Sequence, residues 1–341
     1  MSSVLFSEFE LDGLKLRNRL VMAPMCMYSA KGGHASEFHM VHYTARALGG
    51  IGLIIQEATG VEPCGRITDD CLGLYQDSQV EGLARIVDSV KAAGAHMGVQ
   101  LGHAGRKCKA AEPVIYGPSP IAFDDSYPTP AEMTHADIDR VVEAFGSAAA
   151  RAKKVGYDLV EVHAAHGYLL SSFLSPLSNQ RTDEYGGGSH ENRARILQRV
   201  LDVVQREFGG TVTVRVSAVD YADGGNTVED IIKILQLVKG KVRLVNVSSG
   251  AVVPTPVPTY AGYQITFAEQ IRRACGLPTM AGGLLENPHH LEELVRNQRT
   301  DLVYLGRALL RNPHLPLAAA EALRAEIEWP KPYLRAKNER I

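Results

Sequence analysis

The fold is decided by the stretch Asp158-Leu159-Val160-Glu161-Val162-His163-Ala164-Ala165-His166-Gly167-Tyr168. It is an apolar run of strand length that ends in two imidazoles and a phenol. Such a run between helical segments is typical of a strand that is buried on both faces. Because α/β proteins place their chemistry at the carboxyl ends of such strands, we expect His163, His166 and Tyr168 to belong to a functional site.

Two histidines three residues apart at a strand end have several possible roles. His163 and His166 could both donate hydrogen bonds to one oxygen atom, and Tyr168 could carry a proton to a neighbouring atom. A His-x-x-His pair can also belong to a metal site, although a catalytic zinc normally has a third protein ligand and none is obviously spaced for it. Purely structural histidines are a further alternative. The stretch by itself leaves these alternatives open.

Similar apolar runs recur along the whole chain. The opening stretch is the fourth of eight expected strands, and the others cover residues 18–23, 51–57, 96–101, 212–217, 242–247, 278–281 and 301–305. Helices are expected between them over residues 37–48, 78–94, 134–156, 193–208, 227–240, 266–276 and 288–297. Four pairs with capping-box spacing mark expected helix starts, namely Ser78 with Glu81, Thr134 with Asp137, Thr227 with Asp230 and Thr266 with Glu269.

The alternation of strands and helices predicts the fold class, which is α/β. Eight such units that close on themselves form a (β/α)8 TIM barrel. An open, doubly wound sheet is the competitor, but no G-x-G-x-x-G follows the first strand. We also expect a hairpin around Asp12-Gly13 ahead of the barrel and a long, lid-like insertion over residues 102–133, after the third strand. Residues 1–341 are interpreted as one domain, in which residues 328–341 form an extended arm.

The composition limits the possible partners. The chain has 341 residues, of which 45% are hydrophobic and 22% are charged, and its formal net charge is -2. This charge gives no general attraction to nucleic acid or to anionic membranes. The five cysteines contain no C-x-x-C motif, which favours a reducing, cytoplasmic location. No targeting signal or membrane span is read from the sequence, so we expect no membrane partner.

A barrel brings the carboxyl ends of all its strands to one mouth. Glycines follow the seventh and eighth strands, in Gly282-Gly283 and Gly306-Arg307. Backbone N–H groups at these two loops commonly form the phosphate site of this fold, and Arg307 would add a positive charge. Gln100 could bind a pyrimidine-like edge, and Arg215 in the fifth strand could neutralise an anion that forms there. The alternative for Arg215 is an ion pair with Glu57 or Glu161.

Several motifs resemble the old yellow enzyme family over nearly the whole chain. They are Pro24-Met25-Cys26-Met27-Tyr28, the segment from Gln100 to Arg106, the segment from His163 to Leu170, the segment from Phe173 to Gly187 with its Arg-Thr-Asp-Glu-Tyr-Gly-Gly run, and Tyr304-Leu305-Gly306-Arg307. Cys26 with Tyr28 is similar to the bacterial thermophilic-like subgroup, NADPH dehydrogenases that are also described as ene-reductases. The chain departs from the usual pattern in the additional glycine of Gly186-Gly187-Gly188-Ser189 and in His190, where proline is common.

The resemblance implies a cofactor and a set of binding residues. Tightly bound, non-covalent FMN would contact Ala23, Pro24, Met25, Cys26, Ala58, Gln100, Arg215, Gly283, Gly306 and Arg307. His163 and His166 would hold the substrate carbonyl oxygen, Tyr28 and Tyr168 would line the same pocket, and Cys26 would tune the flavin. Arg335 would reach into the site of a neighbouring subunit, which implies a homodimer or a tetramer of dimers.

The implied activity is reduction of α,β-unsaturated carbonyl compounds. In the implied ping-pong cycle, NADPH or NADH reduces the flavin and leaves, the activated alkene takes hydride from flavin N5, and Tyr168 or solvent supplies a proton. Three rival functions remain open: a metal-dependent barrel hydrolase using His163 and His166, a flavin-dependent tRNA-modifying reductase, and a non-catalytic flavin-binding protein. We expect small-molecule enones as substrates, no nucleic-acid partner and no resident metal.

Overall fold

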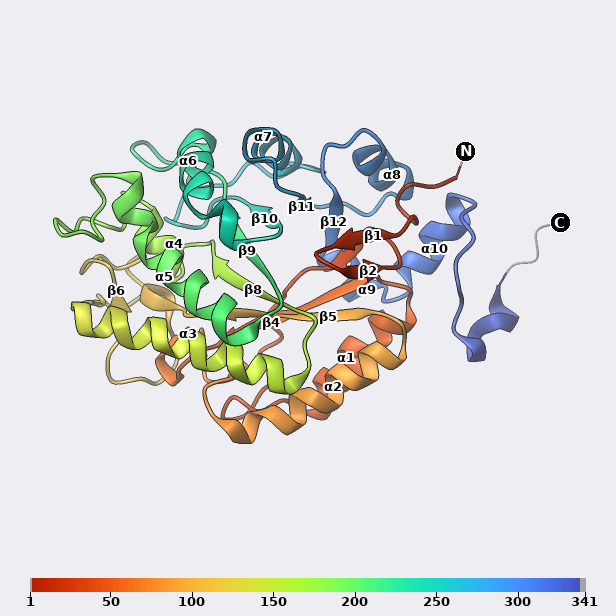
Figure 1. The fold of residues 1–341 in the computed structure, drawn as a ribbon, viewed down its shortest axis with the longest axis horizontal. Coiled ribbons are helices and arrows are strands. Elements are labelled where there is room, and N and C mark those ends of the chain that lie inside the picture. Colours follow the sequence, from red (N-terminus) through yellow and green to blue (C-terminus); the bar gives the residue numbers. More distant parts are fainter. Residues whose placement is uncertain (1, 338–341) are drawn as a thin grey trace.

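Eight parallel strands close into a barrel in the structure, a computed structural model that describes residues 2–337 (Figure 1). The strands are β3 (Leu20–Met22), β4 (Leu53–Gly60), β5 (His96–Gly102), β8 (Leu159–Ala164), β9 (Thr211–Ser217), β10 (Val245–Ser248), β11 (Thr279–Ala281) and β12 (Leu302–Leu305). β12 pairs with β3 and closes the ring. The predicted TIM barrel is therefore confirmed.

Helices surround the barrel and alternate with its strands (Figure 1). They are α1 (Glu37–Leu48), α2 (Val80–Ala92), α3 (His135–Val155), α5 (His190–Phe208), α6 (Val228–Val238), α7 (Ile265–Cys275), α8 (Pro288–Arg296), α9 (Arg307–Arg311) and α10 (Leu315–Ala322). A short additional helix, α4 (Leu169–Leu174), follows β8 directly. No helix is predicted from the sequence at this position.

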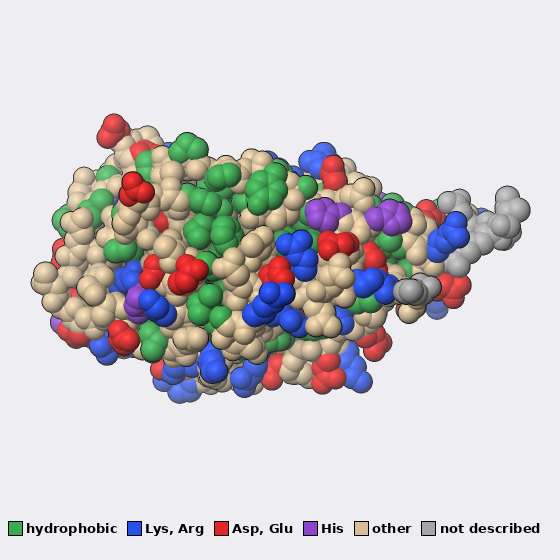
Figure 2. Space-filling model, turned by 90° about the horizontal axis from the view of Figure 1, so that it is seen from above, with side chains coloured by type: hydrophobic (Ala, Val, Ile, Leu, Met, Phe, Trp, Pro, Cys, Tyr) green, Lys and Arg blue, Asp and Glu red, His purple; other side chains and the backbone are tan. Residues whose placement is uncertain are grey.

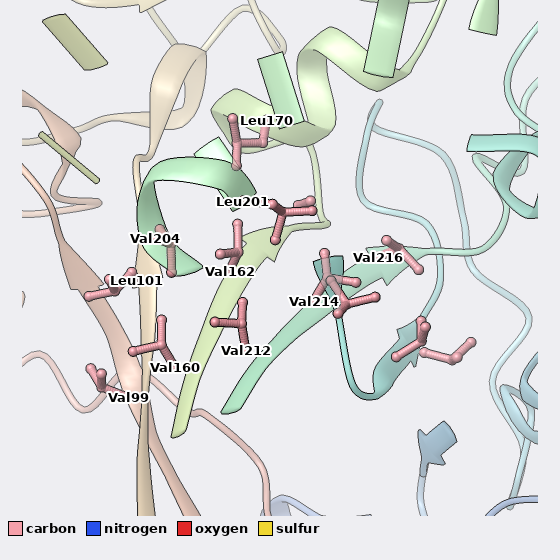
Figure 3. Packing of buried hydrophobic residues seen from close by; sticks show 14 of the residues in the cluster. Val99, Leu101, Val160, Val162, Leu170, Leu201, Val204, Val212, Val214 and Val216 are labelled. Atoms are coloured by element: carbon pink, nitrogen blue, oxygen red, sulfur yellow. The ribbon is translucent and has the colours of Figure 1, made fainter. Parts of the chain in front are cut away.

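The two faces of each strand have different surroundings. Valines at alternate positions of β8 and β9 point outward, where they pack against Leu201 and Val204 of α5 (Figure 3). Burial of each such side chain stabilises the fold by about 1.5–3 kcal/mol. The intervening positions, which include Glu161, His163 and Arg215, face the barrel interior, because successive side chains of a strand point to opposite faces. The alternation therefore places the polar residues inside the ring.

The amino-terminal hairpin is present and closes one end of the barrel. β1 (Phe9–Leu11) and β2 (Leu14–Leu16) are antiparallel and turn at Asp12-Gly13, as predicted. Leu11 and Leu16 are buried in the same cluster as the interior residues Leu53 and Met280. The hairpin thus fills the end of the barrel from which the strands start, which leaves the opposite end for a site.

Two of the four predicted capping boxes are confirmed. The side chains of Thr134 and Thr227 accept from the backbone three residues on and begin α3 and α6. The box at Ser78 is wrong, because Ser78 lies inside a 3-10 turn (Asp77–Gln79) before α2. The box at Thr266 is also wrong, since α7 begins at Ile265. Its preceding residue, Gln264, is held by hydrogen bonds to the serines at the end of β10, which fixes the helix start earlier.

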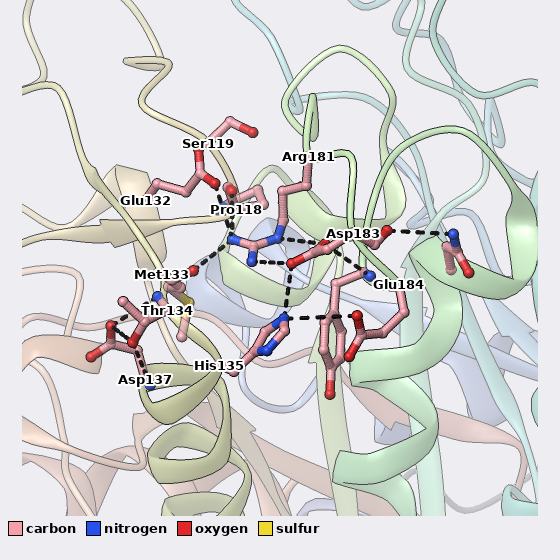
Figure 4. A network of polar contacts seen from close by, with 12 residues as sticks. Pro118, Ser119, Glu132, Met133, Thr134, His135, Asp137, Arg181, Asp183 and Glu184 are labelled. Atoms are coloured by element: carbon pink, nitrogen blue, oxygen red, sulfur yellow. Dashed lines mark hydrogen bonds and ion pairs between the residues drawn. The ribbon is translucent and has the colours of Figure 1, made fainter.

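The Arg-Thr-Asp-Glu-Tyr-Gly-Gly run fastens the loop after α4 to the insertion that follows β5 (Figure 4). Nη1 of Arg181 donates to the carbonyl oxygens of Pro118 at 3.2 Å and Met133 at 2.6 Å. Nε of Arg181 also donates to Asp183 at 3.0 Å, and His135 contacts Asp183 at 3.0 Å. Besides a 3-10 turn (Gly105–Lys107), the insertion contains a short parallel bridge, β6 (Tyr116–Gly117) with β7 (Ala131–Glu132). This motif therefore acts as an anchor for two long loops.

The carboxyl-terminal segment differs from the extended arm that was predicted. Residues Lys331–Ala336 form a 3-10 helix, η5, that lies beyond α10 (Figure 1). The ring of Tyr333 contacts the ring of His314, with centroids 5.7 Å apart. This contact joins η5 to the start of α10. Residues 338–341 of the predicted arm lie outside the described residues.

Charges of both signs are interspersed on the face that carries α6, α7 and α8 (Figure 2). This distribution agrees with the formal net charge of -2. Within residues 2–337, no helix has the combined length and apolar character that a bilayer crossing requires.

Candidate active site

A cavity of about 440 Å³ opens at the carboxyl ends of the barrel strands, a volume within the range of small-molecule and cofactor sites. Seven residues predicted to bind FMN line it, namely Ala23, Pro24, Met25, Arg215, Gly283, Gly306 and Arg307. His166 lines the same cavity. Residues on β9 and directly after β3, β11 and β12 are thereby brought together, although they are far apart in the sequence.

The glycine after β11 has a conformation that other residues rarely adopt. Gly283 has a φ of +106°, and a Cβ added there would lie 2.6 Å from the ring of Tyr263. A Cβ on Gly282 would lie 2.5 Å from the ring of Tyr304. Both positions therefore favour glycine, and Gly283 lines the cavity together with Arg307. Such a surface suits the phosphate end of a nucleotide.

Arg215 is a buried cation without an acidic partner. Arg215 is 8% exposed, and its Nε atom has no hydrogen-bond partner among the residues that the structure describes. None of the ion pairs within residues 2–337 includes Arg215, so the alternative pair with Glu57 or Glu161 is not formed. An unpaired buried charge is costly. The anionic edge of a reduced flavin would provide the missing counter-charge, so the cavity fits FMN.

The two histidines remain neutral in this environment. Burial lowers the pKa of His163 and of His166 well below the usual value, and Arg215 lowers both further. The Nδ1 atom of His163 accepts a hydrogen bond from the backbone N–H of Ala165 at 3.4 Å. Because an accepting ring nitrogen carries no proton, the proton of the neutral ring is on Nε2. Nε2 of His166 lies 2.7 Å from Oγ of Ser248. Two neutral imidazoles therefore stand at the mouth, with ring centroids 5.3 Å apart.

Tyr168 lies beside His163, with ring centroids 5.1 Å apart. Burial raises the pKa of its phenol, so the group carries its proton at neutral pH. Tyr168, His163 and Ala58 border a narrow cleft next to the main cavity. Nζ of Lys107 lies 5.3 Å from the Tyr168 ring and donates to the carbonyl oxygen of His166 at 3.0 Å. A protonated phenol therefore lies beside the imidazoles.

Cys26 and Gln100 border neither opening, although both were predicted at the cofactor. Burial raises the pKa of the Cys26 thiol, which keeps it protonated. The next residue, Met27, donates its backbone N–H to Oε2 of Glu57 at 2.8 Å, so a buried carboxylate holds this loop. Gln100 is 1% exposed and donates to Glu161.

The remaining predicted substrate residues lie at the surface. Tyr28 is 47% exposed and has a φ of +51°. Burial of part of the ring raises the pKa of Tyr28 to about 12. Arg335 is exposed on η5 and borders neither opening. Its predicted place in a neighbouring subunit's site stays a prediction.

Sequence reasoning missed several residues of the cavity. They are Ser248, Tyr263, Gln264, Leu284, Leu285, Glu286, Tyr304, Ala308 and Arg311. Most lie in the loops and short helices that follow β10, β11 and β12. The Ser248-Ser249 pair at a strand end was the available signal, since Ser248 contacts both His166 and Gln264.

The metal interpretation of His163 and His166 finds no geometric support. Among the described residues, two groups of side chains could share an ion: Glu62 with Cys64 and His103, and His135 with Asp183 and Glu184. Neither contains His163 or His166. Glu62 also accepts from Arg140 at 2.9 and 3.0 Å, so a cation already contacts the first group.

Known proteins support the interpretation of this site. The model of the NADH:flavin oxidoreductase / NADH oxidase family matches residues 4–326. An NADPH dehydrogenase of Geobacillus thermodenitrificans is 52% identical over 338 residues, which are 98% of this chain and 99% of that protein. Among solved structures, morphinone reductase is similar with a TM-score of 0.82 and 27% identity, covering 97% of this chain and 92% of that one.

A 2-naphthoyl-CoA reductase is also similar, with a TM-score of 0.88 and 27% identity over 94% of this chain. The chain spans about half of that protein's length, at 52%. The match to the NADPH dehydrogenase is nearly complete in both directions and agrees with the cavity described above. The chain therefore belongs to the NADH:flavin oxidoreductase / NADH oxidase family, as an FMN-dependent NADPH oxidoreductase of the old yellow enzyme type.

Proposed function

We propose that the enzyme reduces the activated C=C bond of α,β-unsaturated carbonyl compounds in a ping-pong cycle, with NADPH as the transient reductant. The observation that carries this proposal is the neutral His163–His166 pair next to the protonated Tyr168. Neutral imidazoles donate hydrogen bonds, and two donors can bind the carbonyl oxygen of an enone.

FMN is proposed to bind tightly but non-covalently along the mouth cavity. Gly283, Gly306 and Arg307 would hold its phosphate, and Arg215 and Gln100 would bind the pyrimidine edge. When bound, FMN supplies hydride transfer between NADPH and the alkene. Cys26, on the loop held by Glu57, would adjust how readily the flavin is reduced.

The proton of the second step is assigned to Tyr168. Hydride addition to the β-carbon increases negative charge on the carbonyl oxygen, and His163 with His166 stabilise that charge. Tyr168 then gives its proton to the α-carbon. Its raised pKa keeps the phenol protonated until that step. Lys107 and Arg106 hold the start of the insertion against the loops after β8 and β10 through hydrogen bonds to backbone carbonyl oxygens.

A second copy of the chain is proposed to complete the site. Arg335 lies on the exposed η5, next to the exposed apolar residues Tyr333 and Leu334. A dimer, or a tetramer of dimers, would bury this segment and bring Arg335 to the neighbouring mouth.

One experiment tests the proposed function. The purified protein is reduced with NADPH under anaerobic conditions, and 2-cyclohexenone is then added. The flavin absorbance is expected to disappear with NADPH and to return with cyclohexenone, with one saturated ketone formed per NADPH. A flavin that is reduced by NADPH but not reoxidised by the enone would refute the substrate class.

A further inference from the structure

A buried carboxylate with no role in the steps above contacts Gln100, which is proposed to bind the flavin edge. Glu161 is 0% exposed and is located in the middle of β8. Gln100 on β5 and Glu161 are register partners, and Asn246 on β10 is the register partner of Arg215 on β9. Arg215 is level with His163, the next inward-facing residue of β8 after Glu161, so four neighbouring strands bring a carboxylate, two amides and a guanidinium to adjoining positions of the barrel interior.

Both oxygen atoms of Glu161 are used by amide groups. Nε2 of Gln100 donates to Oε2 of Glu161 at 2.7 Å, and Nδ2 of Asn246 donates to Oε1 at 2.8 Å. A carboxylate only accepts hydrogen bonds, so it fixes which end of each amide faces it. The amide of Gln100 must therefore turn its nitrogen toward Glu161. Its oxygen, Oε1, receives no hydrogen bond from any residue that the structure describes.

Glu161 also opposes the charge of Arg215. The two groups do not form an ion pair, but the Arg215 guanidinium acts to lower the pKa of Glu161, against the larger raising effect of burial. A negative charge inside the barrel reduces the positive potential that Arg215 produces at the cavity. Because a positive potential favours reduction of a flavin, Glu161 would limit that effect.

We propose that Glu161 is a positioning residue for flavin binding. It orients Gln100 so that the amide oxygen accepts the N3–H of the flavin pyrimidine ring, and its negative charge moderates Arg215 and keeps the flavin reduction potential low. This inference rests on the proposed flavin placement. It adds that Glu161 determines which atom of the Gln100 amide faces the flavin. Glu161 also determines how much of the positive potential of Arg215 acts on the flavin.

The test compares three variants with the wild-type holoenzyme. Glu161→Gln keeps the side-chain shape but removes the charge and presents an N–H to one of the two amides. The FMN dissociation constant is expected to rise about tenfold, the scale of one charged hydrogen bond. The reduction potential is expected to become more positive, by about 30 mV if binding of reduced over oxidised FMN improves tenfold. Glu161→Asp keeps the charge and should keep the potential while weakening FMN binding.

The matched control is Asp220→Asn, which also removes a buried carboxylate, at a residue that borders neither opening. It should lower stability without changing the flavin potential. A Glu161→Gln holoenzyme with the wild-type potential would overturn the inference, because a merely structural role predicts that result.

A second measurement needs no variant. With ¹⁵N-labelled FMN bound to the wild-type protein, the N3–H should show the NMR shift and slow exchange of a hydrogen-bonded proton. An N3–H that is exposed to solvent would refute the orientation proposed for Gln100. A wild-type protein that binds no FMN would instead refute the proposed function, and this inference with it, so the two failures are distinguishable.

Discussion

His163 and Arg215 stand opposite each other on adjacent parallel strands, as register partners of β8 and β9. Both side chains therefore point into the barrel, and burial lowers the pKa of the His163 imidazole, which the positive charge of Arg215 lowers further. The same cation is available to a flavin edge. In the proposed function, this pair of neighbouring backbone positions would link cofactor binding to substrate binding.

Tyr168→Phe tests the proton donor. The variant should slow reoxidation of the reduced flavin by an enone about 10²–10⁴-fold, the usual range for loss of a general acid. Reduction by NADPH should remain close to the wild-type rate, since that step needs no proton from the phenol. Stopped-flow absorbance measures the two half-reactions separately. An unchanged reoxidation rate would assign the proton to solvent.

Arg215→Ala tests whether Arg215 binds the pyrimidine edge of the flavin. Loss of the guanidinium should weaken FMN binding about 10–100-fold, because a charged hydrogen bond is lost. The flavin should also become harder to reduce, with a more negative potential. Arg243→Ala is the control, because Arg243 is a surface residue paired with Asp12. Fluorescence titration and anaerobic redox titration give the two quantities, and wild-type values of both would contradict the role.

The pH dependence of stability tests the buried carboxyl group behind the Cys26 loop. Burial raises the pKa of Glu57 from 4.5 to about 7, although Met27 and Tyr43 donate hydrogen bonds to it. The folded state therefore holds this proton more tightly than the unfolded state. Its contribution to the free energy of unfolding is complete below about pH 4.5 and is lost as the pH rises through 7.

Glu57→Gln should remove that pH dependence, because Gln resembles the protonated acid. The free energy of unfolding of the variant minus that of the wild type should increase between pH 5 and pH 8, by up to about 3 kcal/mol for a difference of about 2.5 between the two pKa values. Urea denaturation at several pH values measures it. A difference that stays constant with pH would show that Glu57 is ionised throughout.

Arg335→Ala tests whether a neighbouring subunit contributes to the site. If it does, the KM for the enone should rise about tenfold while the protein keeps its oligomeric state. Analytical ultracentrifugation and steady-state kinetics are measured on the same samples. Full activity of a strictly monomeric wild-type protein would eliminate the proposal.

The alternation of elements along the chain predicted the barrel, and the stretch from Asp158 to Tyr168 predicted part of its mouth. An apolar strand that ends in His163, His166 and Tyr168 is a local pattern that the sequence shows directly. The closed ring that gathers the strand ends follows from the alternation of elements. Gln264 and Ser248 could not be found in this way, because their role depends on mutual hydrogen bonds between different loops. The wrong capping box at Thr266 has the same cause. A tertiary contact outweighed a local pattern.

Glu161 shows a different limit of sequence reasoning. The sequence shows a carboxylate in a buried strand but not its partners. Only the register of four strands reveals that Gln100 and Asn246 both donate to it. The Arg-Thr-Asp-Glu-Tyr-Gly-Gly run, in contrast, is recognisable in the sequence as a motif. In the structure it anchors two loops through Arg181 and Asp183.

The most direct measurement of the central claim is a crystal structure of the enzyme with FMN bound. The account predicts density for the isoalloxazine ring with its pyrimidine edge at Arg215 and Gln100, its phosphate at Gly283 and Arg307, and one face beneath His163 and His166. A flavin bound elsewhere, or one with Arg215 and His163 on surfaces that do not share it, would contradict the account.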